Sequence, residues 1–184
     1  MKVDDFHSII IKIAKFQDPS KTSLHLYNWG EPLLHPQINE ILEIASEKNF
    51  NIYISSNLNI NKNITTLIEN NVKFLRISNS GYYQENYENT HRRGNVNLVK
   101  SNMYLLRYLI DKSKKNIDIE LFYHMYKSNI GKDLIRMKEL CDDLEFKFTP
   151  IIANFVNVEK VMRYLNNEIS NEDESTISNL LLLS

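Results

Sequence analysis

The stretch from Ser23 to Pro36 reads Ser-Leu-His-Leu-Tyr-Asn-Trp-Gly-Glu-Pro-Leu-Leu-His-Pro. Its first half suits a pleated strand, which we expect to end at Asn28-Trp29, and Gly30 permits backbone conformations that other residues resist. Glu31 precedes Pro32 and therefore favours an extended backbone, while Pro36 is expected to open a helix. A strand, a glycine-containing turn and a helix in this order place ligand contacts at the carboxyl edge of a parallel sheet.

The composition is that of a globular protein. A chain of 184 residues, 42% apolar and 24% charged, is long enough for one domain with a core. The formal net charge of -1 indicates neither nucleic acid nor an anionic membrane as a partner. The first residues, with Lys2, Asp4 and Asp5, do not form a signal-peptide core, and the longest aliphatic run is Leu180-Leu-Leu-Leu183. These features predict a cytoplasmic protein without a membrane span.

Helical and strand patterns alternate along the chain. The expected helices cover residues 4–16, 37–48, 64–69, 96–111, 133–143 and 158–166, and the expected later strands cover 51–55, 73–78, 117–122 and 145–149, the last closed by Pro150. Residues 79–94 are expected to form the longest loop. This alternation indicates right-handed βαβ units and a parallel sheet. The chain opens on a helix, as though one strand and its loop were missing before Met1.

Candidate metal ligands are few. Cys141 is the only cysteine, and its place in a helical pattern predicts a buried, inert thiol. His25 lies on the expected first strand and His35 near the start of the next helix, and neither has a second ligand at metal-binding spacing. The sequence therefore indicates no metal site.

Several segments together resemble the radical S-adenosylmethionine (SAM) enzymes, in particular the iron-sulfur oxidoreductases with a C-terminal cluster domain. The segments that carry the resemblance are Leu26–Pro36 with its Gly-Glu-Pro turn, Ile54-Ser-Ser-Asn-Leu58, Ile77-Ser-Asn-Ser-Gly81, Tyr87-Glu-Asn-Thr-His-Arg-Arg-Gly94 and Asn102-Met103. They follow in the family's order and cover most of residues 1–165. The resemblance implies an α/β fold, a partial parallel (βα) barrel of six strands that lacks its first strand and cluster loop here.

The resemblance also implies a cofactor and the residues that hold it. SAM would lie across the carboxyl edge of the barrel. The implied SAM-binding residues are Gly30, Glu31 and Pro32 for the methionine amino group, Asn57, Ser78 and Ser80 for the ribose and carboxylate, and Phe122 and Tyr123 for the adenine. Residues 1–156 would form the partial core, and residues 157–184 a helical linker toward an absent C-terminal domain.

One departure from the family concerns the 4Fe-4S cluster. The family holds this cluster with three cysteines spaced Cys-x-x-x-Cys-x-x-Cys on a loop after the first strand, because its irons need thiolate ligands. That loop is absent, and Cys141 cannot substitute. We therefore expect a partial radical SAM core, truncated at both ends, that does not cleave SAM by itself.

Two alternatives stay open from the sequence. The chain is a non-catalytic SAM-binding or interaction module with a radical-SAM-like barrel, or it is a gene fragment that is not expressed. A second choice concerns His91-Arg92-Arg93, which suits an anion clamp but equally a solvated loop. The sequence gives no indication of the substrate.

Overall fold

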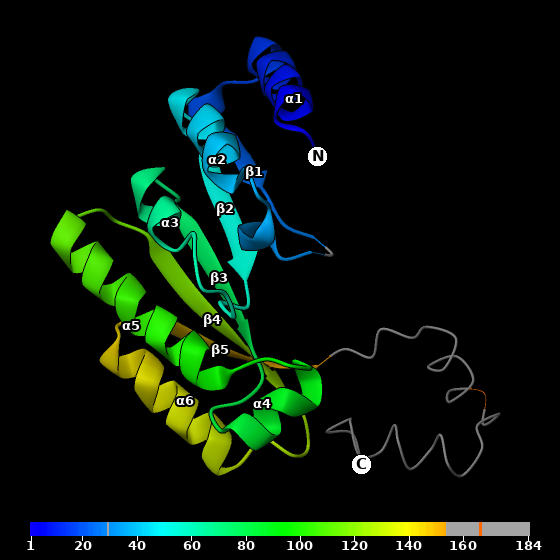
Figure 1. Cartoon of the computed structure of the whole chain (residues 1–184), viewed down its shortest axis with the longest axis vertical. Coiled ribbons are helices and arrows are strands. Elements are labelled where there is room, and N and C mark those ends of the chain that lie inside the picture. Colours follow the sequence, from blue (N-terminus) through cyan, green and yellow to red (C-terminus); the bar gives the residue numbers. More distant parts are fainter. Residues whose placement is uncertain (29, 154–165, 167–184) are drawn as a thin grey trace.

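The computed structural model describes residues 1–28, 30–153 and 166. These residues form an α/β domain around a five-stranded sheet in the order β1-β2-β3-β4-β5, and all four neighbouring pairs are parallel (Figure 1). The predicted parallel α/β architecture is thereby confirmed. The expected helix 158–166 and linker 157–184 lie outside the described residues, apart from Asn166.

The elements follow one another in the predicted alternation. The strands are β1 (Ser23–His25), β2 (Asn51–Ser56), β3 (Phe74–Asn79), β4 (Asp118–Met125) and β5 (Lys147–Ile152). The helices are α1 (Val3–Phe16), α2 (Ile38–Glu47), α3 (Thr65–Glu69), α4 (Gln84–Thr90), α5 (Val96–Ser113) and α6 (Lys132–Asp143), with short 3-10 helices at Pro19–Lys21 and Pro32–Leu34. Parallel strands require such crossovers, since a tight turn cannot join them.

The core lies between the sheet and one layer of helices. Figure 1 shows α2, α3, α5 and α6 along one side of the curved sheet. Side chains alternate along β2 and β3, so that Ile52, Ile54, Leu75 and Ile77 are buried toward the helices. The other side, here called the inner face, is half-buried. Its members include Tyr53, Ser55, Phe74, Arg76, Ser78 and Phe122, which the strand register places side by side.

Two predicted strand boundaries are wrong. β1 ends at His25, three residues before the expected Asn28-Trp29, although the backbone N–H of Leu26 still donates to the Tyr53 carbonyl at 3.0 Å. Pro150 does not close β5 but lies within it, opposite Tyr123. Among the described residues β5 has a neighbour on one side only, and an edge strand tolerates a residue that lacks an N–H donor.

Two other predictions about local structure need correction. The expected loop 79–94 contains α4, a helix of seven residues with the sequence Gln-Glu-Asn-Tyr-Glu-Asn-Thr. It escapes detection by periodicity because Tyr87 is its only apolar residue. Pro36 does not open α2, which begins at Ile38 after the 3-10 helix Pro32–Leu34.

Asparagine and other non-glycine residues form the tight corners. Among the described residues, seven that are not glycine have φ between 53° and 66°, in the left-handed region, and none of the glycines has a positive φ. The seven are Asn49, Leu58, Asn63, Asn71, Arg93, Lys114 and Glu145. Asparagine tolerates this region better than most residues, because its short side chain can hydrogen-bond locally.

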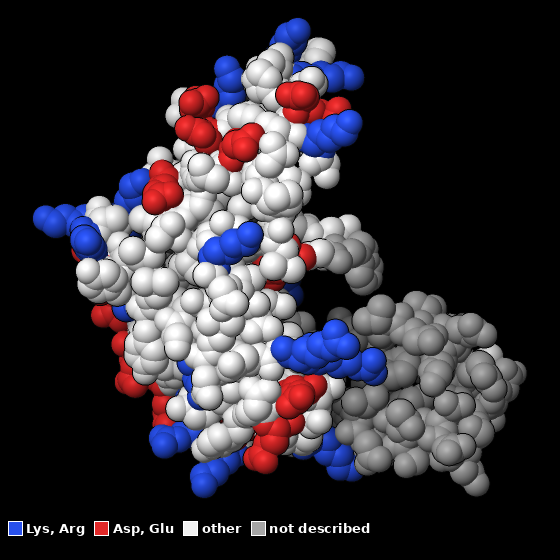
Figure 2. Space-filling model, viewed as in Figure 1, with Lys and Arg blue, Asp and Glu red and all other residues white. Residues whose placement is uncertain are grey.

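Charges are dispersed over the surface. In the face drawn in Figure 2, Lys and Arg are interspersed with Asp and Glu, and neither sign forms a continuous area. This distribution fits the net charge of -1. Within the described residues, no helix has the length and apolar character needed to cross a membrane.

Candidate functional site

A cavity of about 330 Å³ lies at the carboxyl ends of β1, β2 and β3. Its lining residues are Tyr27, Asn28, Gly30, Glu31, Ser55, Ser56, Asn57, Ser78 and His91. Four of the eight residues predicted to bind SAM therefore meet around one cavity, namely Gly30, Glu31, Asn57 and Ser78. They come together because parallel strands end at the same edge of the sheet.

The Glu31 carboxylate fixes the shape of this cavity. One of its oxygens accepts a hydrogen bond from the backbone N–H of Asn57 at 2.8 Å, and the other accepts from the N–H of Leu33 at 3.3 Å. The first bond joins the turn after β1 to the loop after β2. Glu31 is therefore more than the solvated residue of a simple connector, because its side chain sets the relative positions of Gly30 and Asn57.

Ser80 and Pro32, two more of the predicted residues, do not line this cavity. Ser80 is 1% exposed and does not line the cavity. Its hydroxyl contacts the Thr90 hydroxyl and lies 3.0 Å from Nδ1 of His91, so it supports His91 from behind. Pro32 begins the 3-10 helix and lines an adjacent, more apolar cavity of about 770 Å³ beside β1, α1 and α2.

His91 is the cavity residue whose role the sequence left undecided. Its Nδ1 lies 3.0 Å from both the Ser80 and Thr90 hydroxyls, and no hydrogen bond joins its Nε2 to a described residue. The ring stacks on the buried Tyr87 at 4.4 Å with planes 4° apart. Arg92 and Arg93 are exposed, as expected for a solvated loop, whereas His91 is half-buried and lines the cavity.

Two glycines allow this packing. A Cβ atom at Gly94 would lie 2.6 Å from Cε1 of Tyr87 and 2.8 Å from the His91 carbonyl oxygen. A Cβ atom at Gly81 would lie 2.6 Å from the backbone nitrogen of Tyr87. The Tyr-x-x-x-His-x-x-Gly segment is therefore a packed unit in which Tyr87 fills the space left by the glycines and supports the His91 ring.

Burial keeps the His91 imidazole neutral. Desolvation, with a smaller contribution from His124, lowers the pKa of His91 from its ordinary value of 6.5 to about 4. A neutral imidazole adds no positive charge to the cavity at neutral pH. The cavity can therefore accept a cationic group, with the Glu31 carboxylate nearby.

This depressed pKa predicts a dependence of stability on pH. Between about pH 6.5 and pH 4 the unfolded chain binds a proton at His91 and the folded chain does not, so stability falls as the pH falls. We expect His91 to contribute a loss of about 2 kcal/mol between pH 7 and pH 5. Urea denaturation at both pH values, for the wild type and for His91→Phe, measures this contribution of His91. Phenylalanine keeps a ring against Tyr87. Equal losses in the two proteins would contradict the assignment.

Tyr123, expected to contact adenine, lies on the other side of the sheet. It is fully buried toward α6, and its hydroxyl donates to the Asp133 carboxylate at 2.6 Å and contacts the Asn129 carbonyl oxygen at 3.0 Å. Burial and then Asp133 raise its pKa. Phe122, its neighbour, points to the inner face, because adjacent residues of a strand point to opposite sides.

Asp133 is a buried residue that the sequence did not single out. It is 3% exposed, and its carboxylate also accepts hydrogen bonds from the N–H groups of Tyr82 and Tyr83 and from the Asn86 amide, at 2.7, 3.0 and 3.1 Å. Tyr83 is the residue immediately before α4. Asp133 thus anchors the start of α4, the helix that leads to His91, from a position far along the chain.

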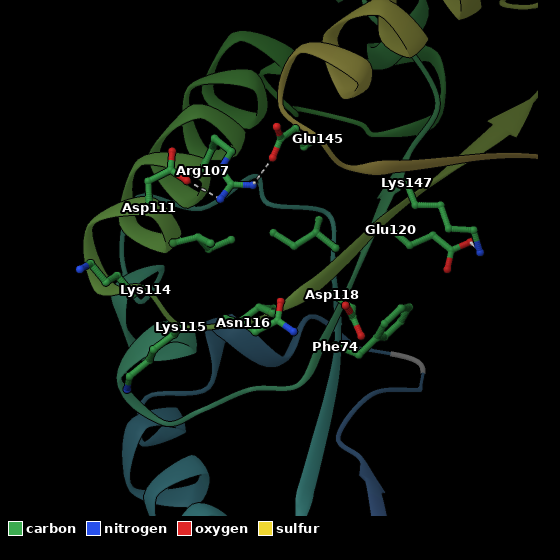
Figure 3. A pocket seen from close by; sticks show the side chains of 13 residues that line it. Phe74, Arg107, Asp111, Lys114, Lys115, Asn116, Asp118, Glu120, Glu145 and Lys147 are labelled. Carbon is green, nitrogen blue, oxygen red and sulfur yellow. Dashed lines mark hydrogen bonds and ion pairs between the residues drawn. The ribbon is translucent and has the colours of Figure 1, made fainter.

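Another cavity is at the opposite end of the sheet. It has a volume of about 840 Å³ and lies near the starts of β3, β4 and β5 (Figure 3). Five of its charged side chains pair with one another: Arg107 contacts Asp111 and Glu145, and Lys147 contacts Glu120. None of the predicted SAM-binding residues lines this cavity, so we do not assign it to a ligand.

The residues present do not suit an iron-sulfur cluster. Cys141, the only cysteine in the sequence, is buried in α6 as predicted, and burial raises its pKa to about 12. In the described part of the chain, no group of three or more His, Cys, Asp or Glu side chains is placed to hold a metal ion. A cluster needs several thiolates together, which this sequence does not contain.

No protein-family model matches the sequence, and no curated protein matches it. Solved structures do resemble it. SuiB from Streptococcus suis, bound to S-adenosylmethionine, is 13% identical with a TM-score of 0.67, over 98% of this chain and 41% of SuiB. The enzyme anSMEcpe with bound AdoMet is 15% identical with a TM-score of 0.61, over 98% of this chain and 54% of anSMEcpe.

A third match is a domain of pyruvate-formate lyase-activating enzyme from Bacteroides vulgatus. It is 14% identical, with a TM-score of 0.54, over 84% of this chain and 89% of that domain. These proteins are radical SAM enzymes, and the predicted radical-SAM type of fold is confirmed. This chain spans less than half the length of SuiB and about half the length of anSMEcpe.

Proposed function

We propose that this chain binds S-adenosylmethionine in the cavity at the ends of β1, β2 and β3, as the cofactor-binding part of a radical SAM enzyme. The observation that carries the proposal is the convergence of Gly30, Glu31, Asn57 and Ser78 on one cavity. These residues come from three separate segments of the chain. The resemblance had assigned each of them to SAM, and the similar fold of SAM-bound structures supports the same function.

The chemistry of the cavity suits this ligand. SAM carries an ammonium group, a sulfonium cation, a carboxylate and a ribose with two hydroxyls. Glu31 supplies negative charge, His91 is neutral at pH 7, and Asn57 and Ser78 offer an amide and a hydroxyl. A cation is attracted by such a lining, whereas a protonated histidine would repel it. Water excluded by the ligand would strengthen these contacts.

The proposal separates binding from catalysis. In radical SAM enzymes, reductive cleavage of SAM yields a 5'-deoxyadenosyl radical that abstracts a hydrogen atom from the substrate. The single buried cysteine of this sequence cannot supply the cluster ligands for that reaction. We therefore propose that the chain alone binds SAM but does not cleave it. A non-catalytic SAM-binding module is the second candidate, and the same lone cysteine favours it.

Two measurements test the proposal. Isothermal titration calorimetry should detect binding of SAM to the full chain at a stoichiometry of one, and absence of binding would overturn the proposed function. Anaerobic reconstitution with iron and sulfide, followed by dithionite and chromatography for 5'-deoxyadenosine, should give no product. Cleavage of SAM under these conditions would contradict the proposed separation of binding from catalysis.

Substitution of Gly30 provides a sharper prediction. A Cβ atom at Gly30 would meet nothing within 4 Å, so the fold does not require glycine there. A bound ligand would occupy that open space. We expect Gly30→Ala and Gly30→Val to leave the thermal midpoint unchanged and to weaken SAM binding progressively, by at least about tenfold for valine, which corresponds to about 1.4 kcal/mol. An unchanged affinity for SAM in Gly30→Val would show that SAM does not bind against this turn.

A further inference from the structure

Arg76 lies on β3 at the inner face and has no ion-pair partner in the part of the chain that the structure describes. Its guanidinium carbon lies 4.1 Å from the centre of the Phe122 ring, and no described carboxylate forms an ion pair with it. Its Nε atom is buried and has no hydrogen-bond partner among the described residues. Buried polar groups of this kind are normally satisfied, so the position of Arg76 needs an explanation.

The nearest acidic residue in the sheet is already engaged. Glu120 is the register partner of Arg76 on β4. Its carboxylate pairs with Lys147 at 2.8 Å and accepts a hydrogen bond from the Thr149 hydroxyl at 2.5 Å. Burial, and then the positive charge of Arg76, lower the pKa of His124 on the same strand. Arg76 and Lys147 thus share the single carboxylate of Glu120, which forms its ion pair with Lys147, and no other described carboxylate forms an ion pair with Arg76.

Arg76 lies immediately below the cavity proposed for SAM. Ser55, its register partner on β2, lines that cavity, and so does Ser78, two residues farther along the same face of β3. Arg76 itself is not part of the cavity lining. On its other side a row of aromatic rings continues along the inner face, with Tyr53 and Phe74 centred 5.5 Å apart.

We propose that Arg76 binds the carboxylate of a second ligand, the substrate, whose adjoining apolar or aromatic group lies against Tyr53 and Phe74. That this second ligand is the substrate rests on the proposed function, whereas the presence of an anion site at Arg76 does not. A guanidinium presents paired donors that match a carboxylate, and stacking on Phe122 orients those donors before the ligand arrives. One unpaired cation suits a singly charged carboxylate better than a doubly charged phosphate, since Lys147 is paired with Glu120.

The test uses benzoate and its neutral analogue benzamide as probes on the full chain. The buried Nε–H of Arg76 should give a protected arginine resonance in a ¹⁵N-correlated NMR spectrum, which Arg76→Lys identifies by its loss. We expect benzoate to shift this resonance saturably and benzamide to leave it unchanged. Arg107 is the internal control, because its Nε is also buried without a partner while its guanidinium is paired with Asp111 and Glu145.

The outcomes separate the anion site from the SAM site. Loss of benzoate affinity by at least about fivefold in Arg76→Lys, with SAM affinity unchanged, supports a second ligand on Arg76. No shift with benzoate, or equal shifts with benzoate and benzamide, overturns the proposal. Competition between SAM and benzoate would assign Arg76 to SAM and also overturn it. If benzoate shifts the Arg76 resonance but the chain does not bind SAM, the anion site is supported and the proposed SAM-binding function is contradicted.

Discussion

Asp133→Ala should lower the free energy of unfolding by about 4 kcal/mol. Its carboxylate accepts four hydrogen bonds, from the Tyr82 and Tyr83 backbones, the Asn86 amide and the Tyr123 hydroxyl. Alanine would leave these donors without their partner, and several of them are buried. Loss of a hydrogen-bond acceptor shared by several buried donors is among the most destabilising changes known.

The matched control is Asp143→Ala, which removes an exposed carboxylate from the same helix. We expect it to change stability by less than about 0.5 kcal/mol. Urea denaturation of both variants measures the difference as a shift of the midpoint at constant slope. Stabilities within about 1 kcal/mol of each other would show that Asp133 does not anchor α4.

The same substitution has a functional consequence. Asp133 fixes the start of α4, and α4 leads directly to His91 at the cavity. Asp133→Asn keeps the volume and one carbonyl oxygen, so part of the protein should stay folded. In that folded fraction we expect weaker SAM binding, although Asp133 does not line the cavity. Unchanged SAM affinity would show that the position of His91 does not depend on this anchor.

The second large effect is expected for Gly81→Ala, which should lower the free energy of unfolding by about 3 kcal/mol. The added Cβ would lie 2.6 Å from the backbone nitrogen of Tyr87 and 2.9 Å from its Cα. Backbone atoms cannot turn aside as a flexible side chain can, so α4 must move as a whole. That movement would also break the hydrogen bond from the Gly81 N–H to the Asn79 side chain, which measures 2.8 Å.

Gly30→Ala serves as the control for Gly81→Ala, because it makes the same chemical change in another loop where the new methyl group has open space. Circular dichroism during thermal unfolding should give a much lower midpoint for Gly81→Ala than for Gly30→Ala. Similar midpoints would mean that α4 is held loosely and that the Tyr87 cluster contributes little. The comparison separates the loss of glycine from the steric contact.

Much of the fold could be predicted from local pattern. Apolar spacing located α1, α2, α5 and α6 within a few residues, since each of these helices buries one apolar stripe. Pattern failed at α4, whose sequence has no stripe and which depends on Asp133 from far along the chain. It also failed at Pro150, because the local rule against proline does not hold at the edge of a sheet.

The candidate site could be predicted in part. Gly30, Glu31, Asn57 and Ser78 follow strand ends that meet at one edge, so order along the chain sufficed to bring them together. Ser80 has the same parity as Ser78, but β3 ends at Asn79 and the chain turns there, so parity no longer determines its direction.

Tyr123, Asp133 and Arg76 show what sequence position leaves out. Tyr123 is one residue from Phe122 and therefore faces the opposite side of the sheet. The role of Asp133 depends on hydrogen-bond partners in other segments. The role of Arg76 depends on the lack of an ion-pair partner among the described residues. No local sequence pattern reveals either property. Such long-range pairings determine how α4 is anchored and whether the Arg76 guanidinium has an ion-pair partner.

The left-handed corners formed by asparagine and other non-glycine residues affect the unfolded state as well as the folded one. Glycine gives an unfolded backbone its widest range of conformations, and this chain contains only four glycines. Corners made by Asn49, Asn63 and Asn71 therefore restrict the denatured ensemble and reduce the entropy lost on folding, while they add some backbone strain to the native state. At these turns, part of the entropic cost of folding is thus replaced by backbone strain in the native state.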